Sequence, residues 1–202
     1  MKLFHSATSP FVRKCLVAAH ELGLMARIAL VPSAPHPVNR DAGVVAHNPL
    51  GKIPTLVTDD GLVLYDSRVI CEYLDSLAGG RLFPRDGAAR WNALTLQSLG
   101  DGLLDAGVLI RYETFARPEP LRWPDWIIGQ TAKLTAGLAG IERHAAAFDD
   151  RVDIGTISLG CALGYLDLRF ASLAWRDRHP ATAAWFAGFS ARPSMLATRP
   201  PA

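Results

Sequence analysis

The sequence contains few cysteines, and none of them has the spacing of a metal site. Three occur among 202 residues, Cys15, Cys71 and Cys161, each far from the others and within an apolar segment of helical character. Isolated cysteines of this kind are typical of buried, reduced thiols rather than of a disulfide framework. The chain has no Cys-x-x-Cys motif, and its six histidines show no ligand spacing. We therefore predict no disulfides and no metal site.

Long runs of one charge and long apolar runs are also missing. The 21 Lys and Arg residues are interspersed with 19 Asp and Glu residues, which leaves a net charge of +2. Such a balance gives no basic stripe for nucleic acid. The apolar stretches are short and interrupted by Gly, His, Arg or Asp, so no transmembrane helix or membrane partner is expected. The first residues, Met1–His5, have a strand pattern rather than that of a signal peptide, and a cytoplasmic protein is expected.

The first third of the chain alternates strand and helix signals. Pro10 suits the first position of a helix and Gly23 suits its end, while Asp59-Asp60-Gly61 is typical of a hairpin turn. The predicted strands are Met1–His5, Arg27–Val31, Thr55–Thr58 and Leu62–Tyr65, and the predicted helices are Pro10–Gly23 and Asp66–Leu77, with a short turn at Asp41–His47. This order predicts a mixed four-stranded sheet covered by helices.

The rest of the chain has helical patterns only. A Gly-rich linker, Ala78–Asp86, precedes a series of predicted helices: Gly87–Ala116, Asp125–Phe148, Asp153–Phe170 and Pro180–Ser190. The third of these has almost no polar face, so we expect it at the centre of a bundle, with Asp153 as its N-cap. The Pro-rich tail Arg192–Ala202 is predicted to be irregular.

The segment Asn48-Pro49-Leu50-Gly51-Lys52-Ile53-Pro54 enforces a turn where a strand begins. Proline removes a backbone donor and is confined to strand starts and edges. A cis Ile53-Pro54 bond would let the N–H and C=O of Ile53 point outward together, ready to pair with an extended peptide. An ordinary trans proline at a strand start is the alternative, since about 5% of X–Pro bonds are cis.

Three motifs stand out in the first part of the chain: Ser9-Pro10-Phe11-Val12-Arg13-Lys14, the turn ending at Ile53-Pro54, and Asp66-Ser67. A fourth is Gly160–Arg169, with Asp153 ahead of it. On these four motifs the whole chain resembles the cytosolic glutathione S-transferases, and within them the bacterial YibF-like group. The resemblance implies a thioredoxin-like α/β domain (1–78), a linker (79–86), an all-α helical-bundle domain (87–202) and a homodimer.

The resemblance also implies residues that bind glutathione, the expected co-substrate. The backbone of Ile53 before Pro54 would pair with the cysteinyl unit as an added strand does. The Ser67 hydroxyl and the helix N-terminus can hold the γ-glutamyl carboxylate, and Asp66 its ammonium. The alternative is that Asp66 or Ser67 only caps a helix. Two further candidates, Lys52 and His36, can reach the glycyl carboxylate, or are solvated loop residues.

Ser9 is the predicted catalytic residue. Its hydroxyl at the start of the first helix can hydrogen-bond the sulfur of glutathione, although a cap followed by Pro10 explains it equally well. The neighbours Thr8 and Ser6 can take the same role. A serine forms no mixed disulfide, so activation of a bound thiol is expected instead. The predicted second-substrate pocket comprises Phe11, Tyr112, Phe115 and Trp123.

The leading hypothesis is a transferase that directs glutathione thiolate at a small hydrophobic electrophile, by conjugation or as a peroxidase. Asp101 is expected either to contact glutathione across a dimer axis or to be an ion-pair partner. The first competing hypothesis is a non-catalytic binding or interaction module of the same fold. The second is a thiol-disulfide reductase, for which Cys15 would have to replace the serine at the helix start.

Overall fold

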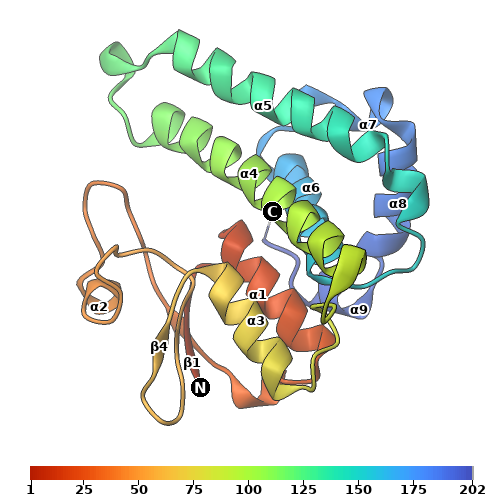
Figure 1. Ribbon diagram of the computed structural model, residues 1–202. Helices are drawn as coiled ribbons and strands as arrows, with labels where there is room; N and C mark the ends of the chain where they lie inside the picture. The colour runs from red at the N-terminus through yellow and green to blue at the C-terminus, as the bar shows by residue number, and fades with distance from the viewer. Residues whose placement is uncertain (202) are drawn as a thin grey trace.

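The computed structural model describes residues 1–201, and its first part is a small α/β domain (Figure 1). Its elements are β1 (Lys2–His5), α1 (Pro10–Glu21), the 3-10 turn η1 (Met25–Arg27), β2 (Ala29–Pro32), α2 (Ala42–Val45), β3 (Thr55–Val57), β4 (Val63–Leu64) and α3 (Ser67–Leu77). Pro10 and Gly23 have the predicted roles: Pro10 opens α1, and Gly23 follows its end with φ of +70°. The turn η1 takes the residues before β2, so the strand begins two residues later than predicted.

The four strands form one mixed sheet in the order β2-β1-β3-β4. The β1–β2 pair is parallel, and the β1–β3 and β3–β4 pairs are antiparallel, as predicted. Gly61 closes the β3–β4 hairpin with φ of +87°, a conformation in which only glycine is free of strain. The predicted thioredoxin-like first domain is therefore confirmed.

The second part contains helices alone. They are α4 (Gly87–Phe115), η2 (Glu119–Leu121), α5 (Pro124–Glu142), η3 (Ala145–Ala147), α6 (Ile154–Arg169), η4 (Ala171–Leu173), α7 (Trp175–Arg178), α8 (Pro180–Ser190) and α9 (Pro193–Ala197). Two predictions were wrong in detail. The helix predicted to reach Phe148 ends at Glu142, and the tail predicted as irregular forms α9. Pro193 opens α9, and burial of Met195 holds it against the core, a tertiary contact that the tail's composition conceals.

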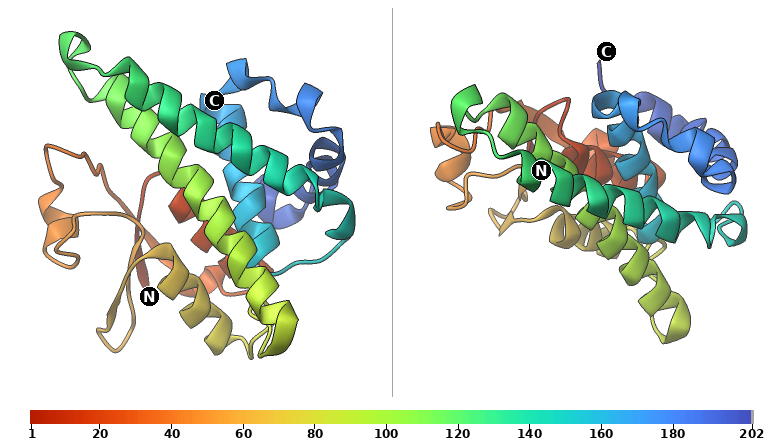
Figure 2. Two further views of the ribbon diagram at one scale, coloured as in Figure 1. Left: turned by 45° about the horizontal axis from the view of Figure 1, so that its top comes forward. Right: turned by 90° about the horizontal axis from the view of Figure 1, so that it is seen from above.

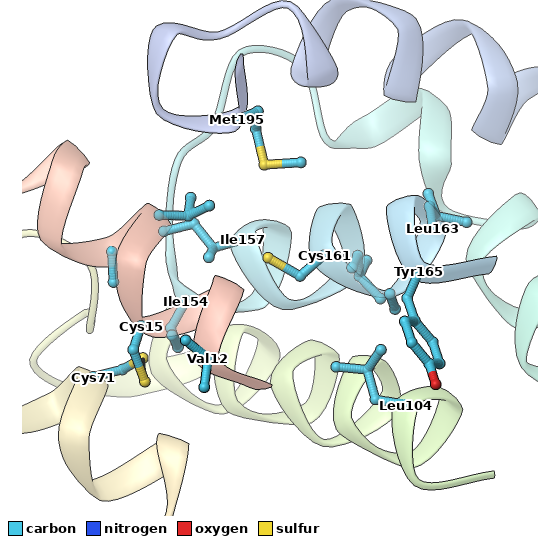
Figure 3. Packing of buried hydrophobic residues seen from close by; sticks show 14 of the residues in the cluster. Val12, Cys15, Cys71, Leu104, Ile154, Ile157, Cys161, Leu163, Tyr165 and Met195 are labelled. Atoms are coloured by element: carbon cyan, nitrogen blue, oxygen red, sulfur yellow. Dashed lines mark hydrogen bonds between the residues drawn. The ribbon is translucent and has the colours of Figure 1, made fainter. Parts of the chain in front are cut away.

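Helix α6 lies at the centre of the bundle, where it packs against α4, against α8 and against α1 of the first domain (Figure 2). Twelve of its sixteen residues are buried. Asp153 and Thr156 form a reciprocal capping box, with the Thr156 N–H donating to Asp153 Oδ1 over 2.9 Å and the Asp153 N–H donating to Thr156 Oγ1 over 3.0 Å. Figure 3 shows Ile157 and Cys161 of α6 among the core residues. The predicted central helix and its Asp153 cap are confirmed.

The three cysteines are buried and free, as predicted. The sulfurs of Cys15 and Cys71 lie 3.9 Å apart between α1 and α3 (Figure 3). Burial raises the pKa of Cys15 well above its ordinary value, and the neighbouring Cys71 adds to the rise. Cys15 is therefore a protonated core thiol, which gives no support to the reductase hypothesis.

One helix, α4, has the length and apolar composition of a membrane span. Half of its apolar window is buried, and the helix packs against α5 and α6. The core helix of a soluble protein passes the same test. The pattern of α4 is therefore explained by packing within the bundle.

Candidate active site

The pairing of the strands brings three predicted site segments to one edge of the sheet. Phe4 of β1 pairs with Thr55 of β3, and Leu56 of β3 pairs with Leu64 of β4. Both pairs are antiparallel, so the chain that follows β1 and β4 lies beside the chain that precedes β3. The segments so gathered are the β1–α1 loop with Ser9, the turn with Ile53 and Pro54, and the start of α3 with Asp66 and Ser67.

The turn before β3 presents an unpaired stretch of backbone. The Ile53–Pro54 peptide bond is cis. Within residues 1–201, neither the N–H nor the C=O of Ile53 makes a hydrogen bond. Buried Asn48 holds the turn in shape: its amide nitrogen donates to the Lys52 carbonyl over 3.1 Å and to Thr55 Oγ1 over 3.0 Å. The Asn48-Pro49 pair is a turn signal in the sequence, and the side-chain hydrogen bonds of Asn48 confirm its place in the turn.

The sequence left open whether Asp66 and Ser67 cap a helix or bind a ligand, and the structure separates these two roles. Asp66 is the N-cap of α3, and its Oδ1 accepts from the Arg68 N–H over 2.9 Å. Ser67 is 2% exposed, yet its hydroxyl and its N–H have no hydrogen-bond partner in the described chain. The cap interpretation therefore holds for Asp66, while Ser67 keeps two donors at a helix N-terminus, where anions bind.

Ser9 caps α1, with its Oγ accepting from the Val12 N–H at a long 3.4 Å. Acceptance of one hydrogen bond leaves the O–H free to donate. Ser9 also lines a small cavity between the β1–α1 loop and α6, to which Arg13, Cys161 and Tyr165 contribute. The Thr8 side chain lines the same cavity, and no hydrogen bond of its hydroxyl or of the Ser6 hydroxyl is present among residues 1–201. All three hydroxyls thus stay available at this end of α1.

Asp101 of α4 is a buried ion-pair partner, the second of its two predicted roles. Its Oδ1 lies 2.5 Å from Lys14 Nζ of α1, and its Oδ2 lies 2.8 Å from Arg68 Nε of α3. Burial opposes the charge of Lys14, but Asp101 outweighs that effect and raises the pKa of the lysine. The pair joins α4 to both helices whose first turns form the site. The sequence analysis did not predict that Lys14 is buried. Lys14 precedes Val17 and Ala18 by three and four residues, so it lies on the same buried face of α1.

A second carboxylate of α4, Asp105, lies near the start of α3. Burial and the charge of Asp101 raise the pKa of Asp105, while Arg68 and Lys52 oppose the rise. Lys52 is exposed and makes no ion pair within residues 1–201. Its effect on the pKa of Asp105 indicates that it lies near the site. His36 instead belongs to its own turn, where its Nδ1 accepts from the N–H groups of Val38 (3.2 Å) and Asn39 (3.1 Å).

The predicted second-substrate residues are spread over the molecule. Phe11 packs against the core, and Tyr112 is about one-third exposed on α4. Phe115 and Trp123 are 62% and 59% exposed and flank the connection between α4 and α5, at the free end of that hairpin (Figure 2). None of the four lines the cavity beside Ser9; that cavity has Tyr165, which the sequence analysis missed, as its aromatic wall.

The fold and the site residues together define a class of protein. A thioredoxin-like domain that presents an unpaired backbone edge, followed by an all-helical domain, is the architecture of glutathione transferases. Residues 8–77 match the glutathione S-transferase N-terminal domain family, and residues 106–188 match the C-terminal domain family. The chain belongs to the glutathione S-transferase family.

Individual relatives match over the full chain. The uncharacterised GST-like protein YibF of Escherichia coli (strain K12) is 33% identical over 205 residues, which cover 100% of this chain and 99% of YibF. A crystal structure of a glutathione transferase family member from Pseudomonas fluorescens Pf-5 with bound glutathione is 52% identical, with a TM-score of 0.97 and coverage of 100% of this chain and 99% of that one. A structure of a family member from the same organism with bound S-(propanoic acid)-glutathione is 50% identical, with a TM-score of 0.92 and full coverage of both chains.

Proposed function

We propose that this protein is a glutathione transferase that binds glutathione at the sheet edge and directs its thiolate at an electrophile. The observation that carries the proposal is the unpaired backbone of Ile53 at the same sheet edge as the free donors of Ser67 and the hydroxyl of Ser9. In the proposed complex, the Ile53 N–H and C=O pair with the cysteinyl unit of glutathione. Bound glutathione in the Pseudomonas relative supports this assignment.

In this proposal the charged ends of glutathione meet matching groups. The γ-glutamyl carboxylate lies on Ser67 and the N-terminus of α3, and the ammonium lies near Asp66, whose Oδ2 has no protein partner in residues 1–201. Lys52 is the nearest candidate for the glycyl carboxylate, and His36 the second.

Ser9 is proposed to stabilise the thiolate. A free thiol titrates near pH 8.5, so it is mostly protonated at neutral pH. Lowering that pKa by about 2 units requires roughly 2.7 kcal/mol of preferential stabilisation of the thiolate. One hydrogen bond to a charged acceptor supplies about 1.5–3 kcal/mol, and a helix N-terminus about 0.3–1 kcal/mol. The Ser9 O–H and the start of α1 are therefore sufficient without a catalytic base.

The S-substituted glutathione bound by the second Pseudomonas structure supports transfer rather than binding alone. A ligand of that kind needs space beyond the sulfur, and the helix that faces Ser9 across the small cavity is α6. A homodimer in the cytoplasm is part of the proposal. The groove between α4 and α5, with Leu99, Leu103 and Gly137 in its wall, supports an interface on that face.

The test is the ionisation of bound glutathione, followed by the ultraviolet absorbance of the thiolate as pH is raised. We expect Ser9→Ala to raise the pKa of the bound thiol by one to two units, because a hydrogen bond of about 1.5–3 kcal/mol is lost. Thr8→Ala and Ser6→Ala test the two alternative hydroxyls of the same loop, and each should leave that pKa unchanged if Ser9 is the donor. An unchanged titration in Ser9→Ala would remove Ser9 from the mechanism. Absence of binding heat with millimolar glutathione would contradict the proposed function itself.

A further inference from the structure

Two arginines of the second domain, one on α4 and one on α6, carry charges that no acidic side chain in the described residues neutralises. Arg111 is half-buried on α4, and Arg169 is exposed on the last turn of α6. Neither makes an ion pair or a side-chain hydrogen bond within the described residues. The Arg111 guanidinium lies 4.1 Å from the ring centre of Phe115, a contact that orients it without cancelling its charge.

Tyr165 connects these arginines to the proposed thiol site. Tyr165 and Ser9 line the same small cavity. The side chain of Tyr165 extends from α6 toward α4, with its hydroxyl at the α4 end (Figure 3). Gly107 of α4 permits this crossing, because a Cβ there would lie 3.1 Å from the Tyr165 ring. Arg111 follows Gly107 by about one helical turn.

The charges of both arginines act at the Tyr165 hydroxyl. Burial raises the pKa of Tyr165, Arg169 and Arg111 oppose the rise, and Tyr112 adds to it. The hydroxyls of Tyr112 and Tyr165 make no hydrogen bond in the part of the chain that the structure describes. We call Arg111, Tyr112, Tyr165 and Arg169 the basic wall.

The nearest acidic groups are occupied or lie at the other end of the site. Glu113 is buried and binds Arg117 and the Trp123 N–H. Asp167 binds Arg176 through both of its oxygens. The carboxylates of Asp66 and Asp105, which make no ion pair within residues 1–201, lie instead near the start of α3.

We propose that the basic wall binds the carboxylate of a small anionic electrophile, which names the second-substrate class of the transferase proposed above and rests on that function. With a 3-halopropanoate, the thiolate sulfur attacks the carbon that bears the halogen. The new S–C bond forms as the C–halogen bond breaks, and the halide leaves with the bonding electron pair. Arg111 and Arg169 hold the carboxylate throughout, and two phenolic O–H groups supply further donors.

The experiment compares two ligands by calorimetry on the full-length protein. S-(2-carboxyethyl)glutathione carries the anion, and S-propylglutathione has a neutral chain of similar length. We expect the anionic ligand to bind about tenfold more tightly to the unchanged protein, equivalent to about 1.4 kcal/mol. Arg111→Gln and Arg169→Gln should each remove most of that preference and leave the affinity for S-propylglutathione as it was.

Arg27→Gln is the matched control. It removes one positive charge from an exposed arginine without a side-chain partner in residues 1–201, at the opposite end of the sheet from Ser9. The control should keep the tenfold preference, and added salt should weaken that preference in the unchanged protein. Equal affinity for both ligands, with glutathione still bound, would overturn the anion proposal alone. Failure to bind glutathione at all would overturn the proposed function as well.

Discussion

The ion pair between Lys14 and Asp101 provides a quantitative test of how the two domains are joined. Both side chains are almost completely buried, at 0% and 2% exposure, whereas the third member of the network, Arg68, is 51% exposed. Replacement of Asp101 by leucine leaves the Lys14 ammonium inside the protein without an anion. Loss of one partner of a buried pair costs about 3–5 kcal/mol, because the remaining charge is uncompensated.

The contribution of Arg68 should be small by comparison. An exposed ion pair is worth about 0–1 kcal/mol, since water screens it. We therefore expect Arg68→Gln to lower the free energy of unfolding by less than about 1 kcal/mol. The double variant Lys14→Met with Asp101→Leu removes both buried charges and should be more stable than Asp101→Leu alone. A coupling of at least about 2 kcal/mol in this cycle is expected for two groups in direct contact.

Denaturant unfolding, followed by circular dichroism at one fixed protein concentration, measures these differences. The pH dependence supplies a second readout. Because the pKa of Lys14 is raised in the folded protein, the stabilisation is complete below the unfolded value of about 10.4 and is lost as pH rises through the folded pKa. Additive costs of the two single substitutions would refute the argument that the pair is coupled.

Two further predictions concern packing and acid stability. Gly100→Ala should lower the free energy of unfolding by about 1–3 kcal/mol, because the new Cβ would lie 2.8 Å from the Ser158 backbone where α4 crosses α6; Gly102→Ala, two residues along with open space around it, should be neutral or stabilise by up to about 1 kcal/mol. Equal melting temperatures for the two variants would contradict this. Glu21 of α1 accepts hydrogen bonds from Arg192 and from Ser194 of α9. The hydrogen bond from Arg192 lowers the pKa of Glu21, burial opposes this effect, and Ser194 adds to it. Its stabilisation is therefore present above the unfolded value of about 4.3 and is lost as pH falls through the folded pKa. Glu21→Gln should cost about 1 kcal/mol at pH 7 and flatten the acid limb of the stability curve; an unchanged acid limb would show that this pair does not act in folding.

The order of elements could be predicted because local signals agree with the tertiary structure. Pro10, Gly23 and Gly61 mark a helix start, a helix end and a hairpin, and each has that place in the fold. The prediction failed where long-range contacts decide. Helix α9 forms in a Pro-rich tail because Met195 enters the core, and the turn η1 displaces the start of β2.

The parts of the candidate site that short sequence motifs define could be predicted. The helix starts at Ser9 and Asp66 and the turn at Ile53 follow from short motifs, and the structure brings them to one sheet edge. The contribution of the second domain was not predictable, because it depends on which helix faces cross. The helical periodicity around Lys14 and Tyr165 indicates only buried core positions. Asp101, the partner of Lys14, lies 87 residues away in the sequence. Tyr165 reaches α4 only because Gly107 leaves room for its ring.

Helix α4 gives the proposed site its polarity. Asp105, whose carboxylate makes no ion pair within residues 1–201, lies near the start of α3, and Arg111 lies six residues further along the same helix, or about 9 Å at 1.5 Å per residue. The sulfur of glutathione is on its central residue, so at most about two extended residues, or about 7 Å, separate the γ-glutamyl end from the cysteinyl unit. A short substituent on the sulfur extends the ligand to a length comparable to this interval. An anion on that substituent would then lie at the end where α4 carries a positive charge, while the γ-glutamyl ammonium lies at the end where α4 carries negative ones. A reversed ligand would place the anion of the substituent beside Asp105 and the ammonium beside Arg111, so the same helix that joins the two domains also favours one direction of binding.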